Sequence, residues 1–220
     1  MENNEQKLLE ILQILNNEGA LENSILIGSW CLFFYKYIFD NFEPTIRTTD
    51  IDFLVPQPKS FKEKSGIAKT LKEINYFIVQ DTLTNKTIFI SPDGFEIEFL
   101  TKLTRSQSPC VKLGNTVIHA ESLPYVDIFA SNYVEVNFHD ILVRVASPAS
   151  YVIQKLLINN ERGEKKEKDI DSIRHVLIYL FASKTYTEEF LNLIKNLPKK
   201  WKRKIQKTSV ENGLNINFNL

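Results

Sequence analysis

A run of six residues, 50–55, constrains the fold of this chain more than any other feature. It reads Asp-Ile-Asp-Phe-Leu-Val and is followed by a Pro-Gln-Pro turn, which ends a strand. Because successive side chains of a strand point to opposite faces, Asp50 and Asp52 share one face, while Ile51 and Phe53 lie on the other. The pattern predicts a strand with one apolar face for the core and two adjacent carboxylates on its other face.

Two like charges at this distance repel each other, so the pair is best explained by cations between them. Mg²⁺ binds a few carboxylate oxygens and completes its shell with water and substrate phosphates, and two such ions about 4 Å apart hold the attacking and leaving oxygens of a phosphoryl displacement. We expect Asp50 and Asp52 to bind Mg²⁺, or Mn²⁺ in its place. The alternative is a chance Asp-x-Asp in a solvated turn, since the chain holds 27 acidic residues, but the apolar neighbours argue against it.

The dipeptide Gly28-Ser29 lies between a predicted strand at residues 24–27 and a predicted buried helix at residues 30–39. Glycine permits a close approach of the backbone, serine supplies a hydroxyl, and the free N–H groups at the helix start attract an anion. A triphosphate fits such a turn. The alternative is an ordinary strand-to-helix turn in which Ser29 caps the helix.

A third carboxylate is expected from the predicted strand at residues 95–100. Glu96 and Glu98 share one face of this strand, and Phe95, Ile97 and Phe99 share the other. We favour Glu98, as a metal ligand or as a general base for the attacking hydroxyl, because it lies deeper in the apolar stretch. Glu96, next to a turn, is the alternative.

Apolar periodicity and turn residues predict the other elements. Helices are predicted at residues 6–17 and 60–74, and exposed loops at 40–49 and 105–115. Strands are predicted at residues 76–80, 87–91, 117–119, 128–130, 134–137 and 141–145. From Ser147-Pro148 onward the pattern is helical, because serine can cap a helix and proline can open one. The predicted organisation is an α/β domain, residues 1–146, followed by an all-α domain, residues 147–220.

The composition is that of an ordinary globular protein. The 27 basic and 27 acidic side chains cancel, and two cysteines indicate neither a disulfide framework nor a zinc site. With no secretory signal and no apolar run near the ~20 residues of a membrane span, we expect a cytoplasmic protein outside the membrane. Residues 195–207 are locally basic and contain Trp201, so they can bind phosphates and stack on an RNA base; a solvated helix surface is the alternative.

Taken in order, three motifs resemble the DNA polymerase beta superfamily of nucleotidyltransferases. They are Gly28-Ser29-Trp30, then residues 47–53 (Arg-Thr-Thr-Asp-Ile-Asp-Phe), then residues 96–100 (Glu-Ile-Glu-Phe-Leu). More narrowly, the chain is similar to bacterial nucleotidyltransferases related to abortive-infection toxins of toxin-antitoxin type, whose C-terminal helices carry a lysine and a later Lys-Asp-x-x-Asp type segment. Lys155 and residues 168–171 match these positions, and the resemblance covers about residues 26–180.

The resemblance implies a mixed sheet flanked by helices and a C-terminal helical domain. It implies that Asp50, Asp52 and Glu98 bind metal, and that Gly28 and Ser29 contact the triphosphate. Lys155 and Lys168 would neutralise phosphate charge and Asp169 would order the site; the alternative for each lysine is a solvated position. Two departures stand out: Asp50 follows Gly28 by 22 positions, a long gap, and the third acid is a glutamate where aspartate is commoner.

The function implied is transfer of a nucleoside monophosphate from a nucleoside triphosphate to a hydroxyl, with release of pyrophosphate. The acceptor is left open between RNA or tRNA, protein and a small molecule. A different class of function is a catalytically inactive protein that keeps the fold, binds a nucleotide, and uses its helical domain to bind a protein partner.

Overall fold

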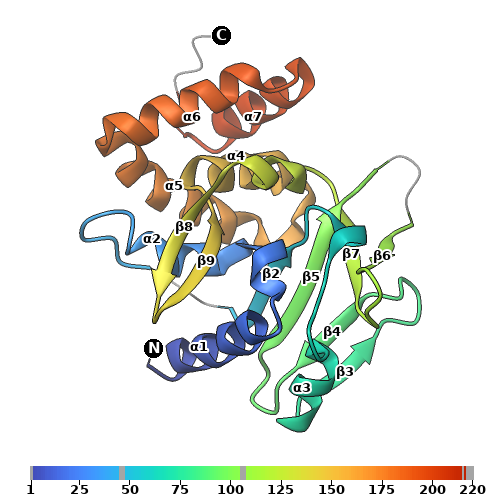
Figure 1. Cartoon of the computed structure of the whole chain (residues 1–220). Helices are drawn as coiled ribbons and strands as arrows, with labels where there is room; N and C mark the ends of the chain where they lie inside the picture. The colour runs from blue at the N-terminus through green and yellow to red at the C-terminus, as the bar shows by residue number, and fades with distance from the viewer. Residues whose placement is uncertain (1, 45–47, 105–107, 215, 217–220) are drawn as a thin grey trace.

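Strands from most of the chain form one mixed sheet with helices packed around it (Figure 1). The computed structural model describes residues 2–44, 48–104, 108–214 and 216. The strands are β1 (Ile25–Ile27), β2 (Asp50–Leu54), β3 (Phe77–Gln80), β4 (Thr87–Ile90), β5 (Glu96–Lys102), β6 (Cys110–Lys112), β7 (His119–Leu123), β8 (Tyr133–Phe138) and β9 (Ile141–Ala146).

Helices precede, interrupt and follow the sheet. The α-helices are α1 (Glu2–Asn17), α2 (Cys31–Tyr35), α3 (Ile67–Glu73), α4 (Pro148–Ile158), α5 (Lys166–Ala182), α6 (Lys184–Asn196) and α7 (Lys199–Glu211). Short 3₁₀ helices span Ala20–Asn23, Gly28–Trp30, Pro58–Ser60, Val126–Ser131, Asn159–Glu161 and Gly163–Lys165. None of the described helices is long and apolar enough to cross a membrane.

The sheet combines parallel and antiparallel pairs. Its strand order is β3-β4-β5-β2-β1-β9-β8, and β7 extends it by pairing with β5 and β6. The pairs β1–β9, β2–β5 and β5–β7 are parallel, and the others are antiparallel. The predicted α/β fold, with a mixed sheet and C-terminal helices, is confirmed.

The alternation predicted for β2 and β5 holds in the structure. Ile51, Phe53, Ile97 and Phe99 are fully buried on the core face, and the acidic residues between them are half-buried on the opposite face. Each fully buried side chain of this size contributes about 1.5–3 kcal/mol of hydrophobic stabilisation. The core therefore fixes which way the carboxylates face.

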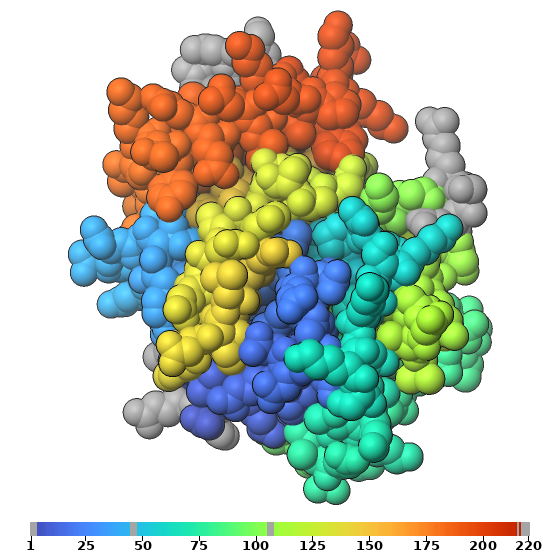
Figure 2. All heavy atoms as spheres, viewed as in Figure 1, coloured from blue at the N-terminus to red at the C-terminus, as the bar shows by residue number. Residues whose placement is uncertain are grey.

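The helical segment is joined tightly to the sheet. Ser147 caps α4, as predicted, because its side chain accepts a hydrogen bond from the Ser150 N–H, and Pro148 opens the helix. The Tyr35 hydroxyl of α2 donates to the Ala146 carbonyl at 3.0 Å, at the end of β9. Helix α4 is buried along most of its length against α5, α6 and α7. In Figure 2 the C-terminal helices, orange to red, form one end of the molecule, opposite α1 and α3.

Several element boundaries differ from the sequence predictions. The helix predicted at residues 60–74 begins only at Ile67, because Gly66 has a φ of 110° and Phe61 is buried in an irregular segment. The helix predicted at residues 30–39 is α-helical only over Cys31–Tyr35 and continues in turns. The strand predicted at residues 128–130 was wrong: this segment is a 3₁₀ helix that follows Tyr125, whose φ is 64°.

The segment at residues 105–115 also departs from the prediction of an exposed loop. Residues 105–107 lie outside the described residues, but Cys110–Lys112 form β6 on β7, with Cys110 and Leu113 buried. The partner strand β7 spans His119–Leu123 instead of residues 117–119. Strand β6 was missed, and the bounds of β7 were misplaced, because the pairing that orders these polar segments is not visible in the local sequence.

A buried glutamate ties the end of α1 to the start of α3. The Glu18 carboxylate accepts hydrogen bonds from the Ser65 N–H and hydroxyl, the Gly66 N–H and the Thr70 hydroxyl, at 2.6–3.0 Å. Burial alone would raise the pKa of Glu18, but these hydrogen bonds outweigh it and lower the pKa from 4.5 to about 2. The carboxylate thereby orders the segment that leads into α3, whose first N–H, at Ile67, donates to Glu63.

We predict that Glu18 makes the protein sensitive to acid. Because its pKa is lower in the folded chain, its contribution is complete above pH 4.5 and is lost as the pH falls toward 2. The contribution is roughly 2 kcal/mol after allowance for solvent screening. Urea unfolding of Glu18→Gln will measure this contribution to the free energy of unfolding. Glu22→Gln, at an exposed residue, is the control. An equal loss of stability in both variants would refute the assignment.

Candidate active site

A cavity of about 320 Å³ lies between the sheet and the helices α4 and α5. The sheet contributes residues from β1, β2, β5 and β7, and the opposite wall comes from α4, α5 and the 3₁₀ turns between them. Its polar lining residues are Ser29, Thr48, Asp50, Asp52, Lys86, Glu98, Glu121, Gln154, Lys155, Arg162, Lys165, Lys168 and Asp169. Acidic groups thus gather on the sheet and basic groups on the helices.

The carboxylates of β2 and β5 lie side by side because the two strands pair in parallel. Asp52 is level with Glu98, and Asp50 is level with Glu96. Glu98 lines the cavity and Glu96 does not, which favours Glu98 as the third acid. Burial raises the pKa of the Asp52 carboxyl to about 7, and the neighbouring Glu98 carboxylate adds to the rise. Asp50 lies nearer the cavity mouth, with 40% of its side chain exposed.

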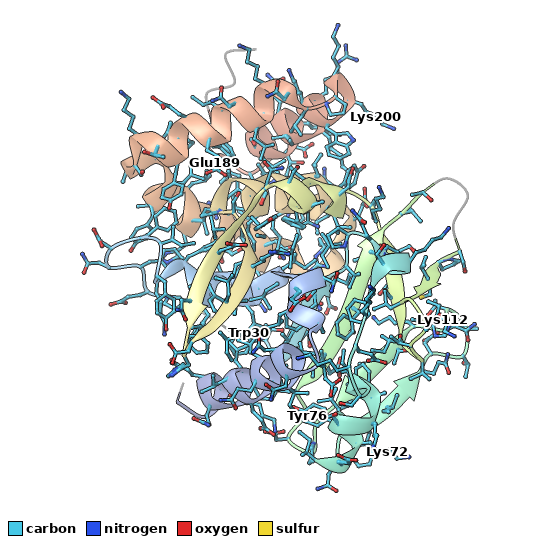
Figure 3. The ribbon with its side chains drawn as sticks, viewed as in Figure 1. Trp30, Lys72, Tyr76, Lys112, Glu189 and Lys200 are labelled. Atoms are coloured by element: carbon cyan, nitrogen blue, oxygen red, sulfur yellow. The ribbon has the colours of Figure 1, made fainter. Side chains whose placement is uncertain are left out.

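The turn after β1 brings its backbone directly against Asp52. Gly28 has a φ of 72°, and a Cβ atom built there would lie 2.2 Å from Asp52 Oδ2. Only glycine fits this close approach. Ser29 follows in the 3₁₀ turn and also lines the cavity, while the next residue, Trp30, is buried in the interior (Figure 3).

The helical wall is built around one buried aspartate. Asp169 of α5 accepts from Lys155 Nζ of α4 at 2.7 Å and from Arg162 Nε at 2.9 Å. The side chains of Lys155 and Asp169 are 5% and 4% exposed. Burial lowers the pKa of Lys155, although its ion pair with Asp169 opposes that shift. Two cations around one anion leave a net positive charge on this wall.

Two further lysines stand at the exposed rim of the same wall. Lys165 Nζ lies 3.8 Å from Asp50 Oδ2, across the cavity mouth. Lys168, in the first turn of α5, is exposed and lines the cavity. Positive side chains therefore line this wall from the buried Lys155 to the exposed Lys165 and Lys168, so an anion inside the cavity would lie beside them.

On the sheet side, one lysine joins two of the carboxylates. Lys86, which precedes β4, places its Nζ 2.8 Å from Glu98 Oε2 and 3.0 Å from Glu121 Oε2 of β7. Glu98 is thus drawn toward Lys86 as well as lying beside Asp52. Among the residues that the structure describes, no group of three or more His, Cys, Asp or Glu side chains is arranged as a metal site.

The donor chemistry nevertheless suits a divalent cation. Asp50 and Asp52 offer carboxylate oxygens on one face of one strand, and Glu98 is level with Asp52. Oxygen ligands of this kind are those that Mg²⁺ prefers, and Mg²⁺ needs only one or two of them besides water and phosphate. Burial and the neighbouring Glu98 raise the pKa of Asp52 despite Lys155 and Lys86, so a further cation bound here would stabilise the charged carboxylate.

The structure brings every site residue singled out in the sequence to this one cavity: Gly28, Ser29, Asp50, Asp52, Glu98, Lys155 and Lys168. The roles assigned to them stay predictions. Arg47, part of the second motif, lies outside the described residues. Sequence reasoning missed Lys86 and Glu121, which reach the cavity through strand pairing, and Arg162 and Lys165, which lie in a charged stretch that resembles a solvated surface.

The basic segment at residues 195–207 lies mainly on α7. Trp201 is half-buried, with its ring edge-on to Tyr125 at 5.0 Å between ring centroids. Lys204 donates to the Tyr125 hydroxyl and to Glu161. The indole therefore already has an aromatic partner within the protein, which does not favour the role of a stacking platform for RNA.

Comparison with known proteins points in the same direction as the cavity. The model of a nucleotidyltransferase family matches residues 6–193. No curated protein sequence matches the chain.

Three solved structures are similar to the chain at low sequence identity. The solution structure of the antibiotic-resistance factor ANT(2'')-Ia has a TM-score of 0.51 and 10% identity, over 96% of this chain and 97% of the other. The crystal structure of ANT(2'')-Ia with adenylyl-2''-tobramycin has a TM-score of 0.49 and 11% identity, over 94% and 97%. An antigenic nucleotidyltransferase-like protein from Paracoccidioides brasiliensis has a TM-score of 0.45 and 14% identity, over 94% and 93%. At these identities the first likeness shows the fold alone.

We predict that Gly28→Ala disturbs Asp52 as well as the backbone. A non-glycine residue at a positive φ costs about 1–3 kcal/mol, and the added Cβ must also displace the Asp52 carboxylate. Gly94→Ala is the matched control, because Gly94 has a φ of 85° and no atom within 4 Å of the added Cβ. Thermal unfolding is expected to show a larger loss for Gly28→Ala. Equal losses would show that Asp52 is not constrained by the turn.

A second prediction concerns the buried aspartate of the helical wall. Asp169→Ala leaves Lys155 buried without its anion, which costs about 3–5 kcal/mol. Asp171→Ala, two residues away and exposed, is the control and is expected to change stability by less than about 0.5 kcal/mol. Urea unfolding midpoints of the two variants will distinguish them. A wild-type midpoint for Asp169→Ala would contradict the view that the wall depends on this anion.

Proposed function

The chain belongs to the nucleotidyltransferase family whose model it matches, and we propose that it transfers a nucleoside monophosphate from a nucleoside triphosphate to an acceptor hydroxyl, releasing pyrophosphate. One observation carries the proposal: a single cavity has adjacent carboxylates on its sheet wall and a cluster of basic side chains on its helical wall. Carboxylates suit divalent cations and the basic wall suits a polyphosphate, so the two walls together suit a metal-bound nucleotide.

The residues have distinct proposed roles in this reaction. Asp50, Asp52 and Glu98 would hold Mg²⁺ or Mn²⁺, which when bound polarises the phosphoryl group and stabilises the charge on the leaving oxygen. Gly28 lets the backbone approach the phosphates, and Ser29 donates its hydroxyl to them. Lys155 and Lys168, with Arg162 and Lys165, balance the charge of the triphosphate.

The cations of the helical wall are preorganised, that is, already in position in the protein without a nucleotide. The Asp169 carboxylate fixes Lys155 and Arg162 in position, so little side-chain entropy is lost when phosphate binds. Such fixed charges are worth more in a half-enclosed cavity than in open water. This arrangement favours in-line transfer by holding the phosphates still.

The acceptor is proposed to be a small molecule with a hydroxyl group. The fold likeness to ANT(2'')-Ia, an antibiotic-resistance factor by its description, supports this class. RNA or tRNA and proteins are the alternative acceptors, and the labelling assay described below includes them. The packing of Trp201 against Tyr125 weakens the RNA alternative. Resistance to aminoglycosides on expression in sensitive cells would identify the small-molecule class, and growth arrest relieved by Asp52→Ala would identify a toxin.

We predict that Asp52→Asn abolishes nucleotide-dependent labelling of the acceptor. Loss of groups that merely support a metal ligand costs about 10–100-fold, so loss of a ligand should lower the rate more than about 100-fold. The protein is incubated with labelled nucleoside triphosphates, Mg²⁺ or Mn²⁺, and separate pools of RNA, proteins and aminoglycosides. Asp140→Asn, in the exposed turn between β8 and β9, is the control and keeps the wild-type rate.

The same assay tests the non-catalytic alternative. A protein that only binds nucleotides would show saturable nucleotide binding by calorimetry and no label transfer to any pool. Transfer that persisted unchanged in Asp52→Asn would also refute the proposal, since it could not arise at this cavity.

A further inference from the structure

Three charged side chains form a cluster at the sheet side of the cavity: Lys86, Glu98 and Glu121. Lys86 Nζ lies 2.8 Å from Glu98 Oε2 and 3.0 Å from Glu121 Oε2. The side chains of Lys86 and Glu98 are only 19% and 14% exposed, and that of Glu121 is 32% exposed. These contacts are therefore shielded from bulk water and are stronger than pairs on an open surface.

Sheet register builds the cluster from three different strands. Ile88 of β4 is level with Glu98 of β5, and Leu100 of β5 is level with Glu121 of β7. Lys86 precedes Ile88 by two residues, so it points to the same face as Glu98. Diagonal neighbours across strands are within reach of long side chains. The lysine thus lies beside β5 where the partner of that strand changes from β4 to β7, and from there it reaches both Glu98 and Glu121.

The turn before β4 holds Lys86 in place. The Asp81 carboxylate accepts from the N–H groups of Leu83 and Thr84 at 2.9 and 2.7 Å, and the Asp81 N–H donates to the Lys86 carbonyl at 2.9 Å. The Lys86 N–H in turn donates to the Thr84 hydroxyl at 3.3 Å. The backbone at Lys86 is therefore ordered by the turn, and its ammonium group is ordered by the two glutamates.

Glu98 needs such a partner because of its other neighbour. Asp52 stands beside it in the parallel ladder, and the two like charges repel. A glutamate has a longer side chain than an aspartate, so without a cation it can rotate away from Asp52. Lys86 supplies the opposite charge, because its ammonium group lies 2.8 Å from Glu98 Oε2 and 3.0 Å from Glu121 Oε2.

We propose that Lys86, anchored by Glu121, is a positioning residue that holds the Glu98 carboxylate beside Asp52 in the orientation that nucleotidyl transfer needs. This inference rests on the proposed function. Lys86 acts through Glu98, and Glu121 acts through Lys86. Two other roles are open to a lysine here: a direct contact with the substrate, or an ion pair that only stabilises the sheet.

Steady-state kinetics separate these roles. Removal of the charge in Lys86→Met is expected to lower kcat about 10–100-fold, the usual effect of a group that orients a ligand, and to leave the KM for the nucleoside triphosphate within about twofold. Lys86→Arg keeps the charge and is expected to recover most of kcat. Glu121→Gln removes the anchor but not the cation, so a smaller loss of kcat is expected.

The results that would overturn the proposal are equally specific. A raised KM with unchanged kcat in Lys86→Met would show that Lys86 binds substrate directly. A lower melting temperature with unchanged kcat would show a merely structural ion pair. Lys112→Met is the matched control, because Lys112 lies exposed on β6, at the edge of the sheet (Figure 3), and is expected to keep wild-type kinetics.

A double-mutant cycle with Glu98→Gln tests whether Lys86 acts through Glu98. If it does, Lys86→Met has little further effect on kcat in the Glu98→Gln background, so the two losses are not additive. Additive losses would overturn the proposal.

Crystal structures of the wild type and of Lys86→Met give a test that does not depend on activity. The Glu98 carboxylate is expected to lie beside Asp52 in the wild type and to turn away in the variant. An unmoved Glu98 would refute the positioning role even if the enzyme is active. Absence of transfer by the wild type would refute the proposed function, while the displacement of Glu98 would still be measured.

Discussion

The parallel pairing of β2 with β5 is the constraint on which the rest of the site depends. Its register is set by buried apolar residues, since Ile51, Phe53, Ile97 and Phe99 must all face the core. The same register places Asp52 level with Glu98 on the other face, where their charges repel. Hydrophobic burial thus fixes an electrostatically unfavourable arrangement in the sheet.

Positive groups on two sides offset this repulsion. Lys86 approaches from the β4 side and holds Glu98, and Lys155 approaches from α4, where its charge lowers the pKa of Asp52. Both lysines are held in position by an ion pair, Lys86 with Glu121 and Lys155 with Asp169. Each of these two lysines therefore lies between a carboxylate of the β2–β5 pair and a second acidic residue that anchors it.

The parts of this site that could be predicted from the sequence are those that produce a pattern among residues close together in the chain. The alternation at residues 50–55 and 95–100 identifies the acid pairs, and Gly28-Ser29 identifies the turn, because a strand repeats every two residues. Ser147-Pro148 identifies the start of the helical segment. The sequence favours Glu98 over Glu96, and the cavity, which only Glu98 lines, supports that preference; the role of Glu98 as third acid stays a prediction.

The remaining parts depend on contacts between distant segments. Lys86 and Glu121 become neighbours only through β5, which pairs with β4 at residues 96–98 and with β7 at residues 100–102. Strand β6 was missed for the same reason, since polar residues 105–115 carry no alternating pattern. In the sequence, Arg162 cannot be distinguished from a solvated arginine. Its role becomes visible only in the structure, where Asp169 of α5 lies beside it.

The two walls of the cavity are encoded in separate stretches of the chain, with the acids at residues 50–121 and the helical cations at residues 155–168. The wall-forming helices follow the sheet as one continuous block after Ala146. Substitutions in that block can change the number and spacing of its positive charges without altering the carboxylate ladder. The charge on one side of the cavity can therefore vary while the backbone pairing that positions the carboxylates on the other side is retained.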